Sequence, residues 1–392
     1  RDEAFYNEGE LIKSDNDSYL SPNGNPVEWI DEESYFFKLS KYEKQLLDLY
    51  ERNKSFILPN SRMNEIKNFV QSGLKDISIS RKNISWGIPV EENNEHSIYV
   101  WLDALTNYIS ALDWCEGSKS FDRYWPADIH LIGKDITRFH AVYWPAFLMS
   151  AGITPPKQVF AHGWWTVEGQ KMSKSLHNVV EPFDLVDKFG LDQIRYFLLR
   201  EVPFGNDGDF SEVTLINRIN SDLANDLGNL VQRVLSMIHK NCEGSLPQPN
   251  ALSNADVELL EHAYNLSQQL RGSVEKQAFH VALEQLWAVI RAGNAYVDHQ
   301  APWSLKKTDP ARMNTVLYVL AEALRHIGIL IQPFMPTSAE KVLDQLAVPP
   351  EAREFRSLGK KNSLIPGKLM PKPEGIFPRF IEKSPSEESQ TI

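Results

Sequence analysis

The run Lys171-Met172-Ser173-Lys174-Ser175 constrains this chain more than any other feature of its sequence. Two lysines three residues apart, among small and hydroxyl-bearing residues, supply two ammonium groups that can neutralise a triphosphate. The run follows a short apolar segment, 158–161, and a turn-forming stretch, 162–170, a pattern that predicts a strand, a turn and a loop. Loops at the carboxyl ends of strands are where open α/β sheets bind ligands. A solvated lysine and serine loop is the alternative, and the complete string disfavours it.

Composition limits the classes of protein to which the chain can belong. Its 392 residues are 42% hydrophobic and 24% charged, which predicts large buried cores in two or three domains. The net charge of −11 excludes a surface that binds polyanions everywhere, so any nucleic-acid contact must be local. No apolar run approaches the roughly 20 residues of a membrane span. The two cysteines, Cys115 and Cys242, cannot form a disulfide framework or a four-thiolate zinc site.

From about residue 97 the pattern alternates between strands and helices. We expect strands at 98–101, 129–133 and 159–161, with helical segments after the first two, which is the pattern of βαβ units. A further helical segment, 184–200, is interrupted by Gly190. This part of the chain therefore predicts a parallel α/β sheet.

After Pro203 the composition becomes helical. One segment places an apolar residue every three or four positions, as a buried helix does: Ile216, Ile219, Leu223, Leu227, Leu230, Val234 and Ile238. Further helical stretches at 256–300, 315–331 and 337–346 predict an α-helical bundle. The segment 376–379 is expected to dock back on this bundle, and the polar tail 384–392 is expected to be mobile.

Two groups of residues next to the predicted strands are candidates for ligand binding. Gly133 and Asp135 directly follow a strand, where the glycine allows close approach and the carboxylate can meet a ribose hydroxyl or an ammonium group; an ordinary turn is the alternative. Four apolar residues share one helical face that could line a pocket: Trp101, Ala104, Leu105 and Tyr108. Such a face is more often plain core.

A third candidate group lies in the predicted bundle. Asn229 and Arg233 are four residues apart on the polar side of the apolar stripe, and Pro302 and Trp303 follow a predicted helix end. Amide, guanidinium and aromatic groups of this kind recognise unstacked bases. A solvated helix face and a packed tryptophan are the alternatives. A separate motif, His326-Ile327-Gly328, falls inside an apolar helix, and we interpret it as core.

Taken together, the residues resemble those of class I aminoacyl-tRNA synthetases. The chain is similar to the methionyl-tRNA synthetases over all but about its last dozen residues. The motifs that carry the resemblance, besides the lysine run, include Pro26-Val27-Glu28-Trp29, Tyr99-Val100-Trp101-Leu102-Asp103, Ile132-Gly133-Lys134-Asp135, Arg138-Phe139-His140 and Tyr143-Trp144-Pro145. The chain departs from part of the family at Leu105, where some members have proline.

The resemblance implies an α/β plus all-α fold in four parts. These are a connective-peptide remnant with the return to the catalytic domain (1–94), the second half of a Rossmann-type nucleotide-binding domain (95–210), an α-helical-bundle anticodon-binding domain (211–383) and a flexible tail (384–392). The first class I signature, His-Ile-Gly-His, belongs to an N-terminal part of the catalytic domain that this sequence lacks. The 392-residue chain by itself is therefore expected to be inactive.

The resemblance also assigns roles to single residues. Lys171 and Lys174 would be catalytic, with the second lysine more important in the transition state. The ATP site would comprise Gly133, Asp135, His162, Gly163, Lys171, Ser173 and Lys174. The methionine pocket would comprise Trp101, Ala104, Leu105, Tyr108, Ile136, Phe139 and His140. Here His140 would bond a tyrosine or the substrate rather than transfer a proton. The CAU anticodon would be read by Asn229, Arg233, Pro302 and Trp303.

The implied activity is ATP-dependent ligation of L-methionine to tRNA(Met) through methionyl-adenylate, with Mg²⁺. No zinc is expected, because residues 5–29 contain no cysteine. The expected partners are methionine, ATP and methionine tRNAs including the initiator. The protein is expected to be a monomer in the cytoplasm or in an organelle, and not to bind membranes. One alternative is a non-catalytic or truncated tRNA-binding fragment. Another is a class I synthetase for leucine, isoleucine, valine or cysteine, which the lack of a large editing insertion and of a cysteine-rich metal site disfavours.

Overall fold

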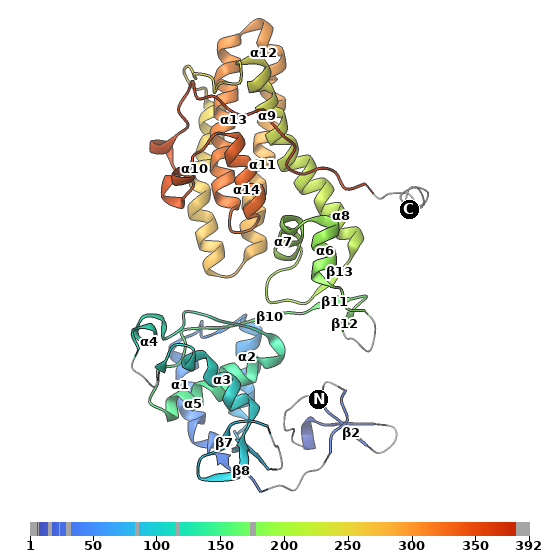
Figure 1. The fold of residues 1–392 in the computed structure, drawn as a ribbon, viewed down its shortest axis with the longest axis vertical. Helices are drawn as coiled ribbons and strands as arrows, with labels where there is room; N and C mark the ends of the chain where they lie inside the picture. Colours follow the sequence, from blue (N-terminus) through green and yellow to red (C-terminus); the bar gives the residue numbers. More distant parts are fainter. Residues whose placement is uncertain are drawn as a thin grey trace. The chain divides into compact units, whose positions relative to one another are not determined.

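The chain forms two compact units, Arg1–His162 and Gly163–Ile392, and each is described by itself. The computed structural model describes residues 6, 8–14, 18–22, 24–28, 33–82, 86–114, 118–172 and 178–381 (Figure 1).

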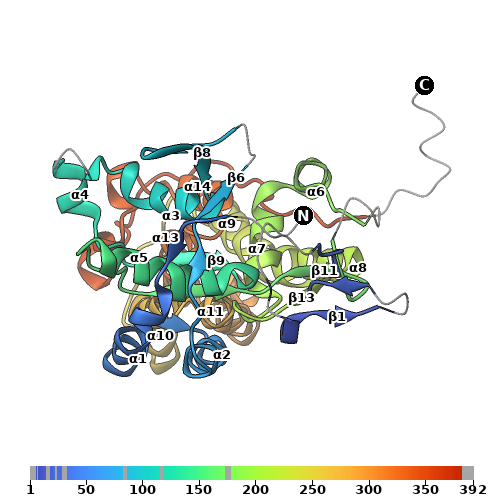
Figure 2. The same ribbon diagram turned by 90° about the horizontal axis from the view of Figure 1, so that it is seen from below.

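A three-stranded parallel sheet forms the centre of the first unit. It has the order β4 (Ile57–Leu58), β10 (Val159–His162) and β9 (His130–Gly133). Helices α1 (Glu43–Arg52) and α2 (Asn60–Gln71) share a buried apolar cluster with β9 and β10. A second cluster joins α3 (Val100–Ser110) to α5 (Trp144–Ser150). Figure 2 shows α1 and α2 together on one side of this unit, with α3 on the other. The expected parallel α/β sheet is therefore confirmed.

The predicted strand at 98–101 is wrong. Strand β8 (Asn93–Ile98) ends at Ile98, and α3 begins at Val100. In addition, β8 belongs to an antiparallel sheet with β6 (Ser80–Lys82) and β7 (Pro89–Val90), not to the parallel sheet. The third parallel strand is instead β4, whose two residues are too few to show any periodicity.

Short elements complete the first unit. Strand β1 (Ile12–Lys13) pairs with β2 (Tyr19–Leu20), and β3 (Phe36–Phe37) pairs with β5 (Ile77–Ser78). The remaining pieces are η1 (Glu8–Glu10), η2 (Leu39–Tyr42), α4 (Lys119–Tyr124), η4 (Lys134–Ile136) and the π-helical turn η5 (Phe139–Tyr143). The last two directly follow β9, so they place their side chains at the carboxyl end of the sheet.

The second unit begins with a small sheet and two helices. Strand β11 (Trp165–Val167) pairs with β12 (Gln170–Lys171) as a hairpin and with β13 (Gly208–Phe210) in parallel. Helices α6 (Pro182–Phe189) and α7 (Leu191–Arg200) are separated by Gly190, whose φ of 95° suits glycine and few other residues. The predicted interruption at Gly190 is therefore confirmed.

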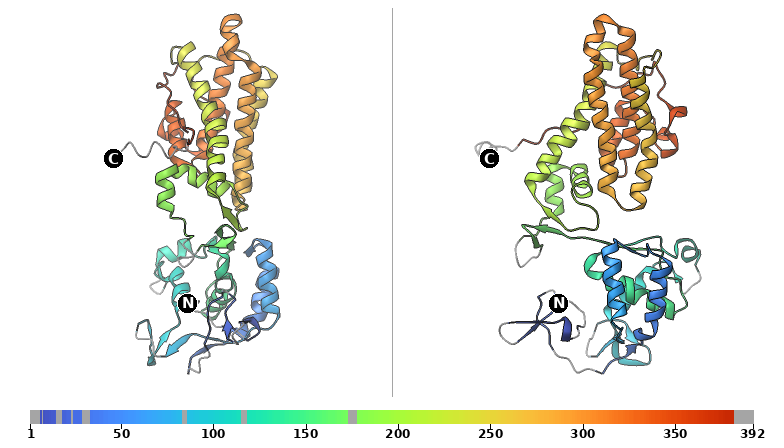
Figure 3. Two further views of the ribbon diagram at one scale, coloured as in Figure 1. Left: turned by 90° about the vertical axis from the view of Figure 1, so that its right-hand side faces the viewer. Right: turned by 180° about the vertical axis from the view of Figure 1, so that it is seen from behind.

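The rest of this unit is a helical bundle, shown from two further sides in Figure 3. Helix α8 (Glu212–Arg218) continues through the π-helical segment η7 (Ile219–Gly228) into α9 (Asn229–Asn241). The other helices are α10 (Asn254–Glu275), α11 (Phe279–Gln300), α12 (Pro302–Thr308), α13 (Pro310–Ile331) and α14 (Pro336–Gln345). Six of the seven predicted stripe residues are buried and Ile216 packs against the same core, so the predicted helix face is confirmed.

The expectation of one helical stretch over 256–300 is wrong, because the chain reverses between α10 and α11. Residues 276–278 form the turn, and Gln277 has a φ of 53°. No glycine or proline marks this turn, and the buried contacts between the two helices form only in the folded bundle.

Helix α13 is long and apolar enough to cross a membrane. However, 89% of its most apolar 18-residue stretch is buried inside the bundle. Its polar groups are paired: Arg325 donates to Glu322 at 2.7 Å, and His326 Nε2 accepts from the Gly359 amide at 2.9 Å. Both features identify a core helix, and the interpretation of His326 as core is confirmed.

The chain after α14 returns across the bundle through η8 (Pro350–Ala352), η9 (Phe355–Ser357) and η10 (Lys360–Asn362). Ile376 and Phe377 are both 7% exposed and belong to the bundle core. Beside them, Arg379 donates to Asn225 Oδ1 at 2.8 Å. The predicted docking of 376–379 is confirmed.

Candidate functional site

An aromatic group at the carboxyl end of the sheet contains most of the predicted methionine-pocket residues. Trp101 of α3 stacks on Phe139 of η5, with 3.8 Å between the ring centroids. Leu105 is 1% exposed and packs in the core, whereas Ala104 on the same helix is exposed. Ile136 packs against the core beneath the sheet. The structure thus brings α3 together with η4 and η5, and it offers stacked aromatic faces of the kind that thioethers contact.

His140 has a defined tautomer. Its Nδ1–H donates to the Ile136 carbonyl at 3.0 Å, so Nε2 carries a lone pair and accepts from the Tyr108 hydroxyl at 2.9 Å. Burial lowers the pKa of His140, which keeps the ring neutral at pH 7. The prediction that His140 bonds a tyrosine is confirmed. Because the Tyr108 hydroxyl donates its hydrogen bond to His140, its oxygen keeps its lone pairs as an acceptor.

His130 is a neighbour of this pair that the sequence did not reveal as a site residue. It lies in β9, is 4% exposed, and its ring centroid is 4.2 Å from that of Tyr108. Neither ring nitrogen has a hydrogen-bond partner among the described residues. Burial lowers the pKa of His130 to about 4. The only available signal was a polar residue within an otherwise apolar predicted strand.

We expect His130 to make the fold sensitive to acid. Its folded pKa lies below the unfolded value, so the full stability is present above pH 6.5 and is lost as the pH falls from 6.5 towards 4. The loss should amount to about 2–3 kcal/mol of unfolding free energy. In urea unfolding across this pH range, the free energy of unfolding should decline less steeply with falling pH for His130→Phe than for the wild type. The exposed-histidine variant His262→Phe is the control, and equal slopes for His130→Phe and the wild type would contradict the prediction.

Gly133 and Asp135 are adjacent to the end of β10. Gly133 is in register with His162, the last residue of β10. A Cβ atom on Gly133 would lie 2.7 Å from the Asp135 carboxylate, so a side chain there would displace it. Asp135 itself is exposed at this edge. The structure therefore places Gly133, Asp135 and His162 at the carboxyl ends of neighbouring parallel strands, as the predicted nucleotide site requires.

Lys171 lies in a hairpin strand, which corrects the loop that the sequence predicted for it. The turn between β11 and β12 is Glu168-Gly169, with φ of 53° and 73°. The Lys171 ammonium lies 4.1 Å from the centroid of the Trp164 ring. The hairpin is held by Asp209, which accepts from the Gly169 amide at 2.8 Å and the Thr166 hydroxyl at 2.7 Å.

The remaining predicted residues of this region are Gly163, Ser173 and Lys174. Ser173 and Lys174 lie outside the described residues. The Asn178 side-chain amide donates to the Lys171 carbonyl at 3.3 Å. A Cβ atom on Gly163 would lie 2.1 Å from the Asn206 carbonyl oxygen, so close packing of the chain explains this glycine without any ligand.

The predicted anticodon residues meet on one side of the bundle. The Arg233 guanidinium donates to Asp298 at 2.6 Å and lies 5.5 Å from the centroid of the Trp303 ring. Trp303 is 49% exposed, and Asn229 is exposed one turn before Arg233. Pro302 is buried, so it can fix the position of Trp303 but offers little surface for contact with RNA. Sequence reasoning missed Asp298, because a pairing across 65 positions leaves no local pattern.

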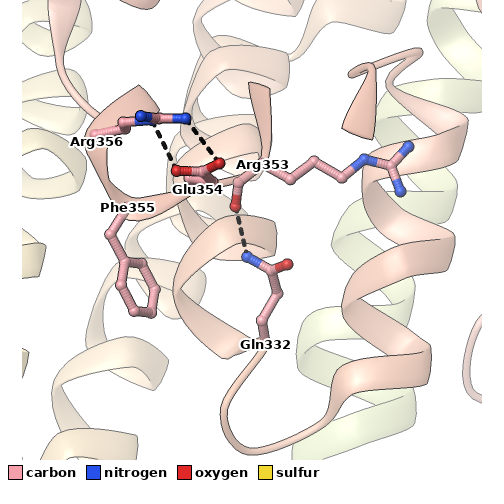
Figure 4. Close-up of a pocket in the computed structure, with 5 residues that line it drawn as sticks. All are labelled: Gln332, Arg353, Glu354, Phe355 and Arg356. Atoms are coloured by element: carbon pink, nitrogen blue, oxygen red, sulfur yellow. Dashed lines mark hydrogen bonds and ion pairs between the residues drawn. The ribbon is translucent and has the colours of Figure 1, made fainter. Parts of the chain in front are cut away.

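A shallow depression of about 500 Å³ lies beside the end of α13 (Figure 4). Its polar groups pair with one another: Arg356 with Glu354 at 2.7 Å, and Gln332 with the Arg353 carbonyl at 2.8 Å. The Arg353 guanidinium points away from it (Figure 4) and bonds Asp344. With no convergent polar groups left among these residues, the depression lacks the features of a substrate site.

Comparisons with known proteins match both units. The family model for class I tRNA synthetases (M) matches residues 7–235, and that for the anticodon binding domain of methionyl tRNA ligase matches residues 246–391. The methionine–tRNA ligase of Brucella suis is 56% identical over 97% of this chain and 74% of its own length. That of Mycobacterium tuberculosis is 49% identical over 99% of this chain and 75% of its own length. The solved structure of Mycobacterium tuberculosis methionyl-tRNA synthetase in complex with methionyl-adenylate superposes with a TM-score of 0.93 at 49% identity, covering 96% of this chain and 75% of that one.

Proposed function

Because this chain belongs to the methionyl family of the class I tRNA synthetases, we propose that it ligates L-methionine to tRNA(Met) with ATP, through methionyl-adenylate. The observation that carries the proposal is the match of residues 7–235 to the synthetase model and of residues 246–391 to the anticodon-binding model. The methionyl-adenylate bound to the Mycobacterium tuberculosis relative supports methionine and ATP as the substrates.

Adenylate formation needs electrostatic help rather than a protein nucleophile. A methionine carboxylate oxygen attacks the α-phosphorus of ATP, and the bond to pyrophosphate breaks as negative charge builds on the leaving group. Lys171 and Lys174 would neutralise that charge; an ammonium about 4 Å from a phosphate oxygen contributes roughly 4 kcal/mol at an effective dielectric constant near 20. Ser173 would add a hydroxyl donor to the same phosphates.

The nucleotide would lie at the carboxyl ends of β9 and β10. Asp135 would accept a hydrogen bond from a ribose hydroxyl or from the methionine ammonium. The backbone at Gly133, His162 and Gly163 would lie close to the nucleotide. Among the described residues, no group of three or more His, Cys, Asp or Glu side chains could hold a metal ion. We therefore expect Mg²⁺ to arrive as the magnesium salt of ATP, bound through phosphate oxygens.

The methionine side chain would lie against the stacked rings of Trp101 and Phe139, with Ala104, Leu105 and Ile136 completing an apolar surround. The Tyr108 hydroxyl and the neutral His140 would form the polar end of this pocket. A neutral pair suits an uncharged thioether, because a buried cation there would be costly without a counter-ion.

The bundle would read the CAU anticodon. The Trp303 face offers a stacking surface, Arg233 and Asn229 offer donors, and Pro302 fixes the tryptophan. Initiator and elongator tRNAs share this anticodon, so both are expected substrates. We also propose a cytoplasmic monomer divided at 1–94, 95–210, 211–383 and 384–392. The alternative of a non-catalytic tRNA-binding fragment is not favoured, because the relatives reported above are named methionine–tRNA ligases.

The direct test is ATP–pyrophosphate exchange by the full-length protein with methionine, leucine or isoleucine as the amino acid. We expect exchange with methionine and at least about 100-fold less with the branched amino acids, because a pocket shaped for an unbranched thioether excludes them. Charging of a tRNA with a CAU anticodon should follow. Equal exchange with leucine would show that the amino-acid assignment is wrong.

A further inference from the structure

A buried carboxylate joins three helices next to the segment that presents Trp303. Asp256 of α10 is fully buried, with 0% of its surface exposed. It accepts the Tyr296 hydroxyl from α11, the Ser253 amide at 2.8 Å and the Arg312 guanidinium of α13 at 2.7 Å. These bonds hold the pKa of Asp256 at about 2 against the opposing effect of burial. The carboxylate is therefore a charged, fully paired junction between α10, α11 and α13.

Arg312 extends this junction to the end of α11. The same terminal nitrogen that reaches Asp256 also donates to Gln300 Oε1 at 2.7 Å. Gln300 is the last residue of α11, and the next residue, Ala301, has the left-handed backbone angles φ 44° and ψ 57°. A non-glycine residue in this region is strained by about 1 kcal/mol or more, so neighbouring contacts must hold it.

The turn at Ala301 determines where Trp303 points. The Ala301 amide donates back to the Val297 carbonyl at 3.0 Å, and its carbonyl accepts from the Ser304 amide at 2.8 Å, which starts α12. Trp303 therefore follows a turn that begins at Gln300, and the Gln300 side chain is held by its hydrogen bond from Arg312. Its ring is 49% exposed and lies beside Arg233 rather than in the core.

We propose that Gln300 and Arg312 are positioning residues for anticodon recognition, which hold the Ala301 turn so that Trp303 faces the RNA. The inference rests on the proposed role of Trp303 and deepens it. Neither side chain contacts the Trp303 ring among the described interactions, so both act through the backbone turn.

The test is a double-mutant cycle between Gln300→Met and Trp303→Ala, with kcat/KM for tRNA(Met) as the readout. Methionine has nearly the volume of glutamine but replaces the amide oxygen that accepts from Arg312 by a thioether, which is only a weak acceptor. Alone, Gln300→Met should lower kcat/KM for tRNA about threefold to tenfold, through KM, with ATP–pyrophosphate exchange unchanged. In the Trp303→Ala background it should cause less than about a twofold further loss, because residues that act through one another are not additive.

A matched variant separates positioning from general stability. Tyr296→Phe removes a hydroxyl from the same carboxylate but leaves the bond between Arg312 and Gln300 in place. It should lower the melting temperature while leaving the KM for tRNA unchanged. Full additivity of Gln300→Met with Trp303→Ala, or an equal rise in KM for Tyr296→Phe, would overturn the inference. If Trp303→Ala itself left tRNA use unchanged, the proposed anticodon role would fail instead.

Discussion

Lys174→Ala is expected to slow methionine-dependent ATP–pyrophosphate exchange by about 100-fold or more while leaving the affinity for tRNA(Met) unchanged. The reason is that the ammonium would bond the departing pyrophosphate more strongly in the transition state than ATP in the ground state, so its removal lowers kcat rather than binding. Losing one such charged donor usually costs roughly 2.7–4 kcal/mol of activation free energy.

The control for this variant is another lysine of the same unit. Lys188 of α6 pairs with Glu212 on the surface, so Lys188→Ala removes one positive charge from a residue to which no role in ATP binding is assigned. It should leave exchange within about twofold, since exposed ion pairs contribute little. If Lys174→Ala behaved like Lys188→Ala, the catalytic assignment of the lysine run would be wrong.

Trp303→Ala is expected to produce the opposite pattern. Base stacking on an aromatic side chain contributes about 1–3 kcal/mol, so kcat/KM for tRNA(Met) should fall roughly 5- to 150-fold while exchange of pyrophosphate is preserved. The measurement is aminoacylation at varied tRNA concentration, with the wild-type CAU anticodon and with a scrambled one.

Phe355→Ala provides the comparison for Trp303→Ala. Phe355 is 54% exposed on the same bundle, close to the 49% of Trp303, and it lines the depression beside α13. Its removal should not change tRNA use. The residual activity on the scrambled tRNA should be the same for Trp303→Ala and the wild type. An equal loss on both tRNAs would indicate that Trp303 supports folding only.

The parts of the fold that were predictable are those encoded by local periodicity. The apolar stripe from Ile216 to Ile238 identified a buried helix face, and Gly190 identified a break between helices. The π-helical segment η7 could not be foreseen, because it changes the hydrogen bonding without disturbing the order of apolar residues. The turn at Gln277 was missed because its positive φ is imposed by packing of α10 on α11 rather than by a glycine.

In the candidate site, too, local sequence patterns were predictable and contacts between distant residues were not. Trp101 and Tyr108 could be grouped because helical spacing places them on one face. His140 was expected to bond a tyrosine or the substrate, and the structure identifies that tyrosine as Tyr108. The hairpin that holds Lys171 was missed, since Glu168-Gly169 is not among the turn pairs that usually signal a two-residue hairpin. Asp209 and Asp298 bond residues that are distant in sequence, so no local pattern identifies them. His130 left one weak local signal, a polar residue within an otherwise apolar predicted strand.

The most direct test is single-turnover formation of methionyl-adenylate by the full-length protein, without tRNA, measured by quenching and quantifying enzyme-bound adenylate and free pyrophosphate. We expect one equivalent of methionyl-adenylate for each active site, formed at least about 100-fold more slowly by Lys174→Ala. Pyrophosphate release that requires tRNA, or adenylate formed equally fast by the wild type and Lys174→Ala, would contradict it.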